Sequence, residues 1–202
     1  MARKEEHRRL RTRYAVLGDG RTEQFYLQHL KSLNGYNYRV YPSLFDDITI
    51  DIVENKIDEL LSGGCDKIVY FTDYDIIVKQ GKQEKFKELL IKYENKPEII
   101  ICESMPSIEF WFLLHYKKTT KEFQNASEVI TELQKYITDF SKGKTFLQKQ
   151  KWVKNLCSAG RFEKAQKFAS EILNQKDNQD VGSHFPFTKV HLGIEQFEKQ
   201  RK

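Results

Sequence analysis

The chain has 202 residues, of which 39% are hydrophobic and 31% charged, and its formal net charge is +5. This length suits one domain with a proper core, and the absence of any apolar run of ~18 residues excludes a membrane-spanning helix. The polar, basic N-terminus lacks the apolar segment of a secretory signal, and the three widely spaced cysteines are typical of reduced thiols. We therefore expect a cytoplasmic protein without a membrane partner, whose positive charge is compatible with nucleic acid.

Residues 1–13 form a basic segment with six Arg or Lys side chains. We expect Arg8, Arg9 and Arg11 to contact phosphates, because each such contact adds to a salt-dependent affinity for nucleic acid. A solvated, frayed terminus explains the same residues equally simply.

The first strand is expected over residues 14–17, and a helical pattern of apolar residues follows from Phe25. Between them, the sequence Gly18-Asp19-Gly20 permits a tight turn and a close approach of the backbone. Asp19 would lie on this turn and Glu23 in the first turn of the helix, so both carboxylates fall near the carboxyl end of the strand. As alternatives, Asp19 is an ordinary turn residue and Glu23 is favoured by the helix dipole.

A second strand is expected over 37–41, a helix over 48–61, and a buried strand over 68–71. The buried strand runs directly into Asp73 and Asp75. Ligands of open α/β sheets bind beyond the carboxyl ends of the strands, where these two acids offer oxygen ligands for a divalent cation. Aspartate is also common in turns, so this motif becomes informative only if other strand ends carry acids as well.

A helix over 83–93 and a fourth strand over 99–102 complete a βαβαβαβ alternation within residues 14–102. This pattern predicts an α/β fold with a central parallel four-stranded sheet flanked by helices. Pro106 suits the first turn of a further helix, which places Glu109 at a third strand end. The apolar run that follows is interpreted as core, and His115 as a core histidine or a ligand.

Strand signals fade beyond residue 116, and helices are expected over 129–140, 146–156 and 162–173, then a polar linker over 174–180 and a last helix after Thr188. We expect a catalytic core over 14–116, a helical C-terminal extension over 117–202 packed on it as part of a single domain, and a basic arm over 1–13. Lys149 and Lys151 lie near the aromatic residues Phe146 and Trp152, a pattern that suits single-stranded nucleic acid. A solvated lysine face over a packed aromatic stripe is the alternative.

Five acids thus come from three strand ends that a parallel sheet brings together, and these are Asp19, Glu23, Asp73, Asp75 and Glu109. Clustered carboxylates repel one another, and divalent cations relieve that repulsion. Oxygen-only ligands select Mg²⁺ or Mn²⁺ over zinc. Two such ions could activate water and stabilise the leaving oxygen in phosphodiester cleavage.

At the level of motifs, the acid–Gly turn, the second acid four residues later and the strand-terminal Asp-x-Asp resemble the Toprim fold of topoisomerases, primases and OLD-type nucleases. More narrowly, the chain resembles the RloB-like proteins of bacterial phage defence. Four segments carry this resemblance: Gly18-Asp-Gly-Arg-Thr-Glu-Gln-Phe-Tyr, Phe71-Thr-Asp-Tyr-Asp, Ser104-Met-Pro-Ser-Ile-Glu-Phe-Trp-Phe-Leu-Leu-His and Pro186-Phe-Thr-Lys-Val-His.

The resemblance implies a Toprim nuclease with two Mg²⁺ or Mn²⁺ ions, which acts on DNA or RNA, with tRNA among the candidate substrates, beside a nearby-encoded ABC/AAA-type ATPase. The five acids would be its catalytic and metal-binding residues, although Asp19 stands where the fold usually has glutamate and is one methylene shorter. Secondary candidates for phosphate contacts or support of the ligands are Ser107, His115, Lys189 and His191. The oligomeric state stays open, and a homo-oligomer is compatible with this interpretation.

Two other functions are compatible with the same residues. The first is a non-catalytic subunit that binds metal or nucleic acid beside the ATPase. The second is a phosphatase of the haloacid dehalogenase type, whose nucleophile also lies in an Asp-x-Asp after a strand. Such enzymes usually carry that motif on the first strand, whereas here two βα units precede it, so we rank this alternative last.

Overall fold

The computed structural model describes residues 12–41, 45 and 49–199. The arginines proposed as phosphate contacts, Arg8, Arg9 and Arg11, lie outside the described residues. Among the described helices, none is long and apolar enough to cross a membrane.

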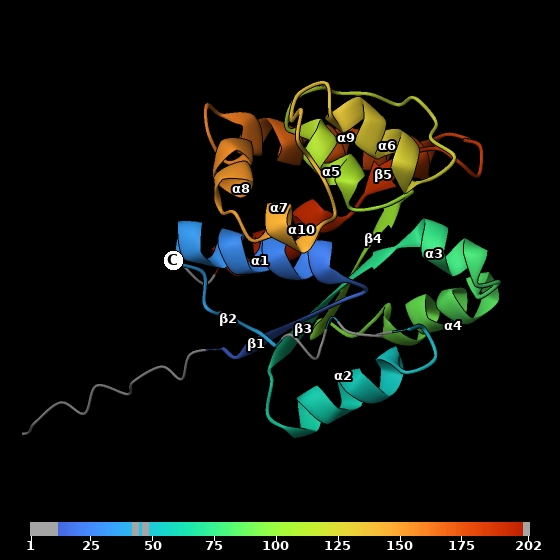
Figure 1. Ribbon diagram of the computed structural model, residues 1–202. Coiled ribbons are helices and arrows are strands. Elements are labelled where there is room, and N and C mark those ends of the chain that lie inside the picture. Colours follow the sequence, from blue (N-terminus) through green and yellow to red (C-terminus); the bar gives the residue numbers. More distant parts are fainter. Residues whose placement is uncertain (1–11, 42–44, 46–48, 200–202) are drawn as a thin grey trace, which may run out of the picture.

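A mostly parallel sheet forms the centre of the protein, as expected for an α/β fold (Figure 1). The strand order is β2-β1-β3-β4-β5, with bounds β1 Tyr14–Gly18, β2 Tyr38–Val40, β3 Lys67–Asp73, β4 Ile99–Met105 and β5 Phe187–Thr188. The first four strands are parallel, and β5 pairs antiparallel with β4. The expected count of four strands was therefore wrong by one. A strand of two residues is too short to leave a periodic pattern in the sequence.

The strand sequences explain this arrangement. All five residues of β1 are buried, as are six of the seven in β3, so these strands are covered on both faces as parallel strands require. Strand β3 pairs with β1 on one side and β4 on the other. This central position brings the carboxyl end of β3 beside those of both neighbours.

Helices cover both faces of the sheet (Figure 1). On one face lie α1 (Arg21–Asn34) and α10 (Val190–Glu198), and on the other lie α2 (Val53–Ser62), α3 (Tyr74–Lys79) and α4 (Gln83–Tyr93). Gly193 lets α10 approach the sheet closely, because a Cβ there would lie 2.8 Å from the Cys102 sulfur. Gly18 has a similar role at the end of β1, since its Cβ would meet the Phe45 ring at 2.6 Å.

The remaining helices lie beside α1 and beyond the carboxyl end of β4 (Figure 1). They are α5 (Glu109–Leu114), α6 (Ala126–Leu133), α7 (Lys144–Leu147), α8 (Lys151–Leu156) and α9 (Arg161–Asn178). Their aromatic side chains pack together and onto Tyr26 of α1, so this group of helices shares a core with the sheet layer.

Three expected elements differ in the structure. Helix α9 continues to Asn178, where a polar linker from residue 174 was predicted. The helix expected over 146–156 is two short helices, α7 and α8, and the helix expected over 129–140 ends at Leu133. Polar residues in 174–178 keep the helix on the surface rather than end it, since helix formation does not require an apolar stripe in the last turn.

Candidate metal centre

Four of the five acids come together at the carboxyl edge of the sheet. Asp19 follows β1, Glu23 lies in the first turn of α1, Asp73 ends β3, and Glu109 begins α5 just after β4. We call Asp19, Glu23, Asp73 and Glu109 the carboxylate cluster. After burial, which has the largest effect, the negative charges of Glu23, Glu109 and Asp19 raise the pKa of Asp73, and those of Glu109 and Asp19 raise the pKa of Glu23.

Asp19 is bound tightly by β3. Its Oδ1 accepts a hydrogen bond from the Tyr70 hydroxyl at 2.8 Å, and its Oδ2 accepts from Thr72 Oγ1 at 2.5 Å and from the Asp73 backbone N–H at 3.1 Å. Tyr70 and Thr72 lie two residues apart and therefore point to the same face of the strand. Asp19 thus ties the turn after β1 to the end of β3 and fixes the backbone that carries Asp73.

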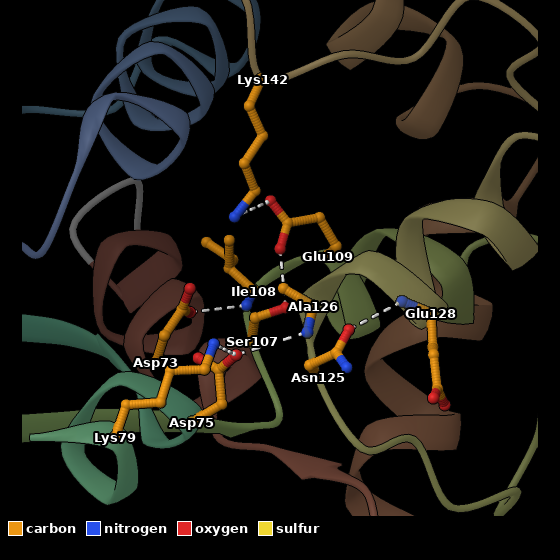
Figure 2. Close-up of polar contacts among 10 residues, drawn as sticks. All are labelled: Asp73, Asp75, Lys79, Ser107, Ile108, Glu109, Asn125, Ala126, Glu128 and Lys142. Carbon is orange, nitrogen blue, oxygen red and sulfur yellow. Dashed lines mark hydrogen bonds and ion pairs between the residues drawn. The ribbon is translucent and has the colours of Figure 1, made fainter.

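The segment between β4 and α5 orients Asp73 and Glu109 (Figure 2). The backbone N–H of Ile108 donates to Asp73 Oδ1 at 2.7 Å, and Ser107 Oγ donates to Glu109 Oε2 at 2.7 Å. Lys142 enters from the opposite side, and its ammonium lies 3.0 Å from Glu109 Oε1 in an ion pair. Each carboxylate therefore has one oxygen held by the same short connection, which also contains the cis peptide bond Met105–Pro106.

Three of the four acids in the cluster are almost completely enclosed, whereas Asp19 is partly exposed. Glu23 and Asp73 are each 3% exposed, and Glu109 is 0% exposed. Burial first, and then the charge of Glu109, raises the pKa of Glu23 to about 8. Burial followed by the charges of Glu23 and Glu109 raises the pKa of Asp73 well above its usual value. Burial also raises the pKa of Asp19 to about 6, although its three hydrogen bonds oppose the shift.

Asp75, the second acid of the Asp-x-Asp motif, points to different partners (Figure 2). Its Oδ2 accepts from Lys79 Nζ at 2.9 Å and from the backbone N–H of Ala126 at 3.3 Å. Ala126 is the first residue of α6, where Asn125 also caps the helix. Asp75 thus connects α3 with the beginning of α6, and these contacts of its carboxylate lie outside the carboxylate cluster.

The secondary candidates also separate into different places. Ser107 belongs to the cluster through Glu109. His115 packs against Trp111 and Phe162, and its burial lowers its pKa to about 3. Lys189 pairs with Glu103 at 2.6 Å, and His191 is buried in the first turn of α10, where burial lowers its pKa to about 4.

The basic residues proposed for nucleic acid within the extension are exposed. Lys149 lies between α7 and α8, and Lys151 is the first residue of α8. Trp152, by contrast, is buried and packs with Phe112, Phe140 and Phe146. Trp152 is therefore part of the core, and the two lysines remain a predicted phosphate contact.

The donor set of the cluster fits a divalent cation. Its four side chains supply only carboxylate oxygens, which suit Mg²⁺ or Mn²⁺. The buried oxygen Glu109 Oε1 receives no hydrogen bond and is matched only by the Lys142 ion pair. Within the described part of the chain, no three His, Cys, Asp or Glu side chains are already arranged around one point as metal ligands. Binding an ion would therefore require side-chain rotation within the cluster.

Comparison with family models identifies the family of the chain, which the geometry of the site alone does not. Residues 14–197 match the model of the RloB-like protein family. The chain belongs to the RloB-like family. No curated protein and no solved structure matches the chain. In this RloB-like chain, the matched region includes all four acids of the carboxylate cluster and Lys142.

Three contributors to the site were not predicted from the sequence. Tyr70 and Thr72 were recognised only as strand residues, although their two-residue spacing from each other would have placed them on one face of the strand. Lys142 was not among the residues predicted to take part in the site. Its ion pair joins residues 33 positions apart in sequence, and no local pattern signals such a contact.

Proposed function

We propose that this RloB-like protein is a divalent-metal-dependent nuclease that hydrolyses phosphodiester bonds in nucleic acid, with tRNA and other RNA among its candidate substrates. The observation that carries the proposal is the enclosed carboxylate cluster at the carboxyl edge of the sheet. Its members come from three separate strand ends and include two acids, Glu23 and Asp73, whose pKa values are raised by burial and mutual repulsion.

Such a cluster is unfavourable as a purely structural feature. Buried carboxylates lose their hydration, and like charges at close range oppose ionisation further. Perturbed pKa values of this kind gather at functional sites, where a ligand compensates for the repulsion. One lysine beside the cluster does not balance the charge of several carboxylates, and a divalent cation is the ligand that carboxylate oxygens bind best.

The residues divide into distinct roles. Glu23, Asp73 and Glu109 would hold the cations, for which we propose two Mg²⁺ or Mn²⁺ ions. Bound ions of this type supply an activated water and stabilise the developing charge on the leaving oxygen. Asp19 acts through the backbone of Asp73, and Ser107 acts by fixing one oxygen of Glu109, so both are positioning residues.

The biological setting belongs to the same proposal. Membership of the RloB-like family and the resemblance of the strand-end motifs to Toprim proteins support a Toprim-type core, a role in anti-phage defence and an ABC/AAA-type ATPase partner. The basic N-terminal segment and the exposed lysines Lys149 and Lys151 are the surfaces that we propose for phosphate contacts.

The test is a cleavage assay with end-labelled tRNA, single-stranded RNA and DNA, with Mg²⁺ or Mn²⁺ and with the ATPase encoded beside the gene. Asp73→Asn should abolish cleavage, as should excess chelator, while Asp58→Asn on the exposed side of α2 should retain it. Thermal unfolding would verify that the Asp73 variant is folded. Full activity of folded Asp73→Asn would refute the assignment.

A non-catalytic subunit that binds metal or nucleic acid is the second candidate. The observation that favours it is that Asp19 already uses both oxygens for hydrogen bonds within the protein. In that case the wild-type protein would co-purify with the ATPase but cleave none of the substrates, either alone or in the complex.

A further inference from the structure

Lys142 is the single exposed member of the site. Its side chain is 44% exposed, whereas Glu109, with which it pairs, is 0% exposed. It comes from the connection between α6 and α7, on the opposite side of the site from the strand ends that supply the acids (Figure 2). The approach to the Glu109 carboxylate therefore passes the Lys142 ammonium.

The backbone that carries Lys142 is well anchored. Phe140, two residues earlier, is buried and packs against Phe112, Phe146 and Trp152. The side chain of Gln134 donates to the Phe140 carbonyl at 2.9 Å, and Gly143 begins the next helix as its N-cap. Only the long, flexible side chain of Lys142 is thus free to change position, while its Cα stays beside the cluster.

The charge of Lys142 is directed at the cluster. Among the ion pairs of the described residues, the Lys142–Glu109 pair is the one that involves a cluster carboxylate. The ammonium of Lys142 and the buried carboxylate of Glu109 are thus in direct contact.

This position conflicts with a metal ion on Glu109. Ser107 already holds Oε2, so Oε1 is the oxygen that Glu109 can offer to a cation, and Lys142 lies 3.0 Å from it. An ammonium group and a divalent ion cannot both contact the same face of one carboxylate oxygen, because their charges repel and their volumes overlap. One must leave when the other binds.

We propose that Lys142 is an internal counter-ion that competes with the divalent cation for Glu109 and is displaced when the cation binds. The inference rests on the proposed function in one respect, namely that the carboxylate cluster binds a divalent cation. It adds that this chain sets its own metal affinity through a lysine supplied by the helical extension. The cluster is thereby neutralised in part before the metal arrives.

The first test measures Mn²⁺ affinity by titration calorimetry, without any substrate. Removing the competing charge in Lys142→Gln should tighten Mn²⁺ binding by about tenfold or more, since a charge at this range is worth several times RT at an intermediate dielectric. Lys142→Arg keeps the charge and should bind Mn²⁺ as the wild type does. Lys144→Gln removes an exposed lysine two residues away and serves as the matched control. Unchanged or weaker binding by folded Lys142→Gln would overturn the proposal.

The second test uses the wild-type protein and so does not depend on the folding of any variant. Amine acetylation read by mass spectrometry should show Lys142 reacting several times faster with Mn²⁺ present, while Lys144 reacts at the same rate. Equal or slower labelling of Lys142 with Mn²⁺ would contradict displacement.

The two proposals fail in different ways. If the wild type cleaves nucleic acid with Mn²⁺ but Lys142→Gln binds the ion no more tightly, the competition is refuted and the nuclease assignment stands. If Lys142→Gln binds Mn²⁺ more tightly but no protein cleaves any substrate, the competition stands and the nuclease is refuted. If none of the proteins binds Mn²⁺, both are refuted.

Discussion

Replacing Glu23 with glutamine should stabilise the metal-free protein at high pH. Burial and the charge of Glu109 raise the pKa of this carboxyl from 4.5 to about 8 in the folded protein. Below pH 4.5 the carboxyl is protonated in both the folded and the unfolded state. Between 4.5 and about 8 the unfolded state releases its proton while the folded state retains it, so the free energy of unfolding falls as the pH rises.

The size of the effect follows from the shift. Each pKa unit corresponds to ~1.4 kcal/mol, so a shift from 4.5 to about 8 sets an upper limit of about 5 kcal/mol on the stability lost by pH 8. A neutral amide of the same shape avoids the ionisation, although it makes imperfect contacts in a site built for an acid. We expect Glu23→Gln to gain about 1–3 kcal/mol over the wild type at pH 8, and little at pH 4.5.

Urea and thermal unfolding in the presence of chelator would measure this difference. A gain of this size corresponds to a rise in Tm of roughly 2–10 °C for a chain of this length. Glu84→Gln is the matched control, because Glu84 also lies in the first turn of a helix, α4, but is exposed. The reasoning would be refuted if Glu23→Gln lowered stability equally at both pH values, or if wild-type stability did not decline between them.

Three further predictions concern the neighbouring residues and the ion. Asp75→Asn should lower the free energy of unfolding by about 1 kcal/mol, because it weakens the contacts to Lys79 and Ala126, yet its Mn²⁺ affinity should stay within about threefold of the wild type. If calorimetry showed a loss of Mn²⁺ affinity as large as that of Asp73→Asn, Asp75 would belong to the metal centre. Thr72→Val removes a donor to Asp19, so the free energy of unfolding should fall by ~1–2 kcal/mol. NMR titration should give the variant a higher Asp19 pKa than the wild type, and an equal pKa in the two proteins would show that the bond is unimportant. Free Mn²⁺ at 100 times its Kd should stabilise the wild type by about 2.7 kcal/mol in thermal unfolding, and an equal gain in Asp73→Asn would place the ion elsewhere.

The sequence was most informative where local patterns are strong. The apolar runs before Asp19, Asp73 and Glu109 predicted β1, β3 and β4, and the βα alternation predicted a parallel sheet. Because parallel strands end at one edge of a sheet, the sequence also predicted that acids from three strand ends lie near one another. Strand β5 was missed because two residues carry no period, and its partner β4 lies more than 80 residues earlier in the chain.

The details of the site depend on side-chain direction, which the spacing of residues does not determine. Asp73 and Asp75 are two residues apart, yet α3 begins at Tyr74, so the chain changes from strand to helix between them. The two carboxylates consequently point to different partners, Ile108 for Asp73 and Ala126 for Asp75. The Lys142 contact arises only when the extension packs against the sheet layer, which is a tertiary effect.

The most direct test of the carboxylate cluster as a metal centre is a crystal of the protein soaked in Mn²⁺, with the ions located by anomalous scattering. We predict at least one Mn²⁺ within coordination distance of oxygens from Glu23, Asp73 and Glu109, with the Lys142 ammonium moved away from Glu109. Strong anomalous peaks elsewhere, with this cluster free of the ion and Lys142 still paired to Glu109, would contradict the account.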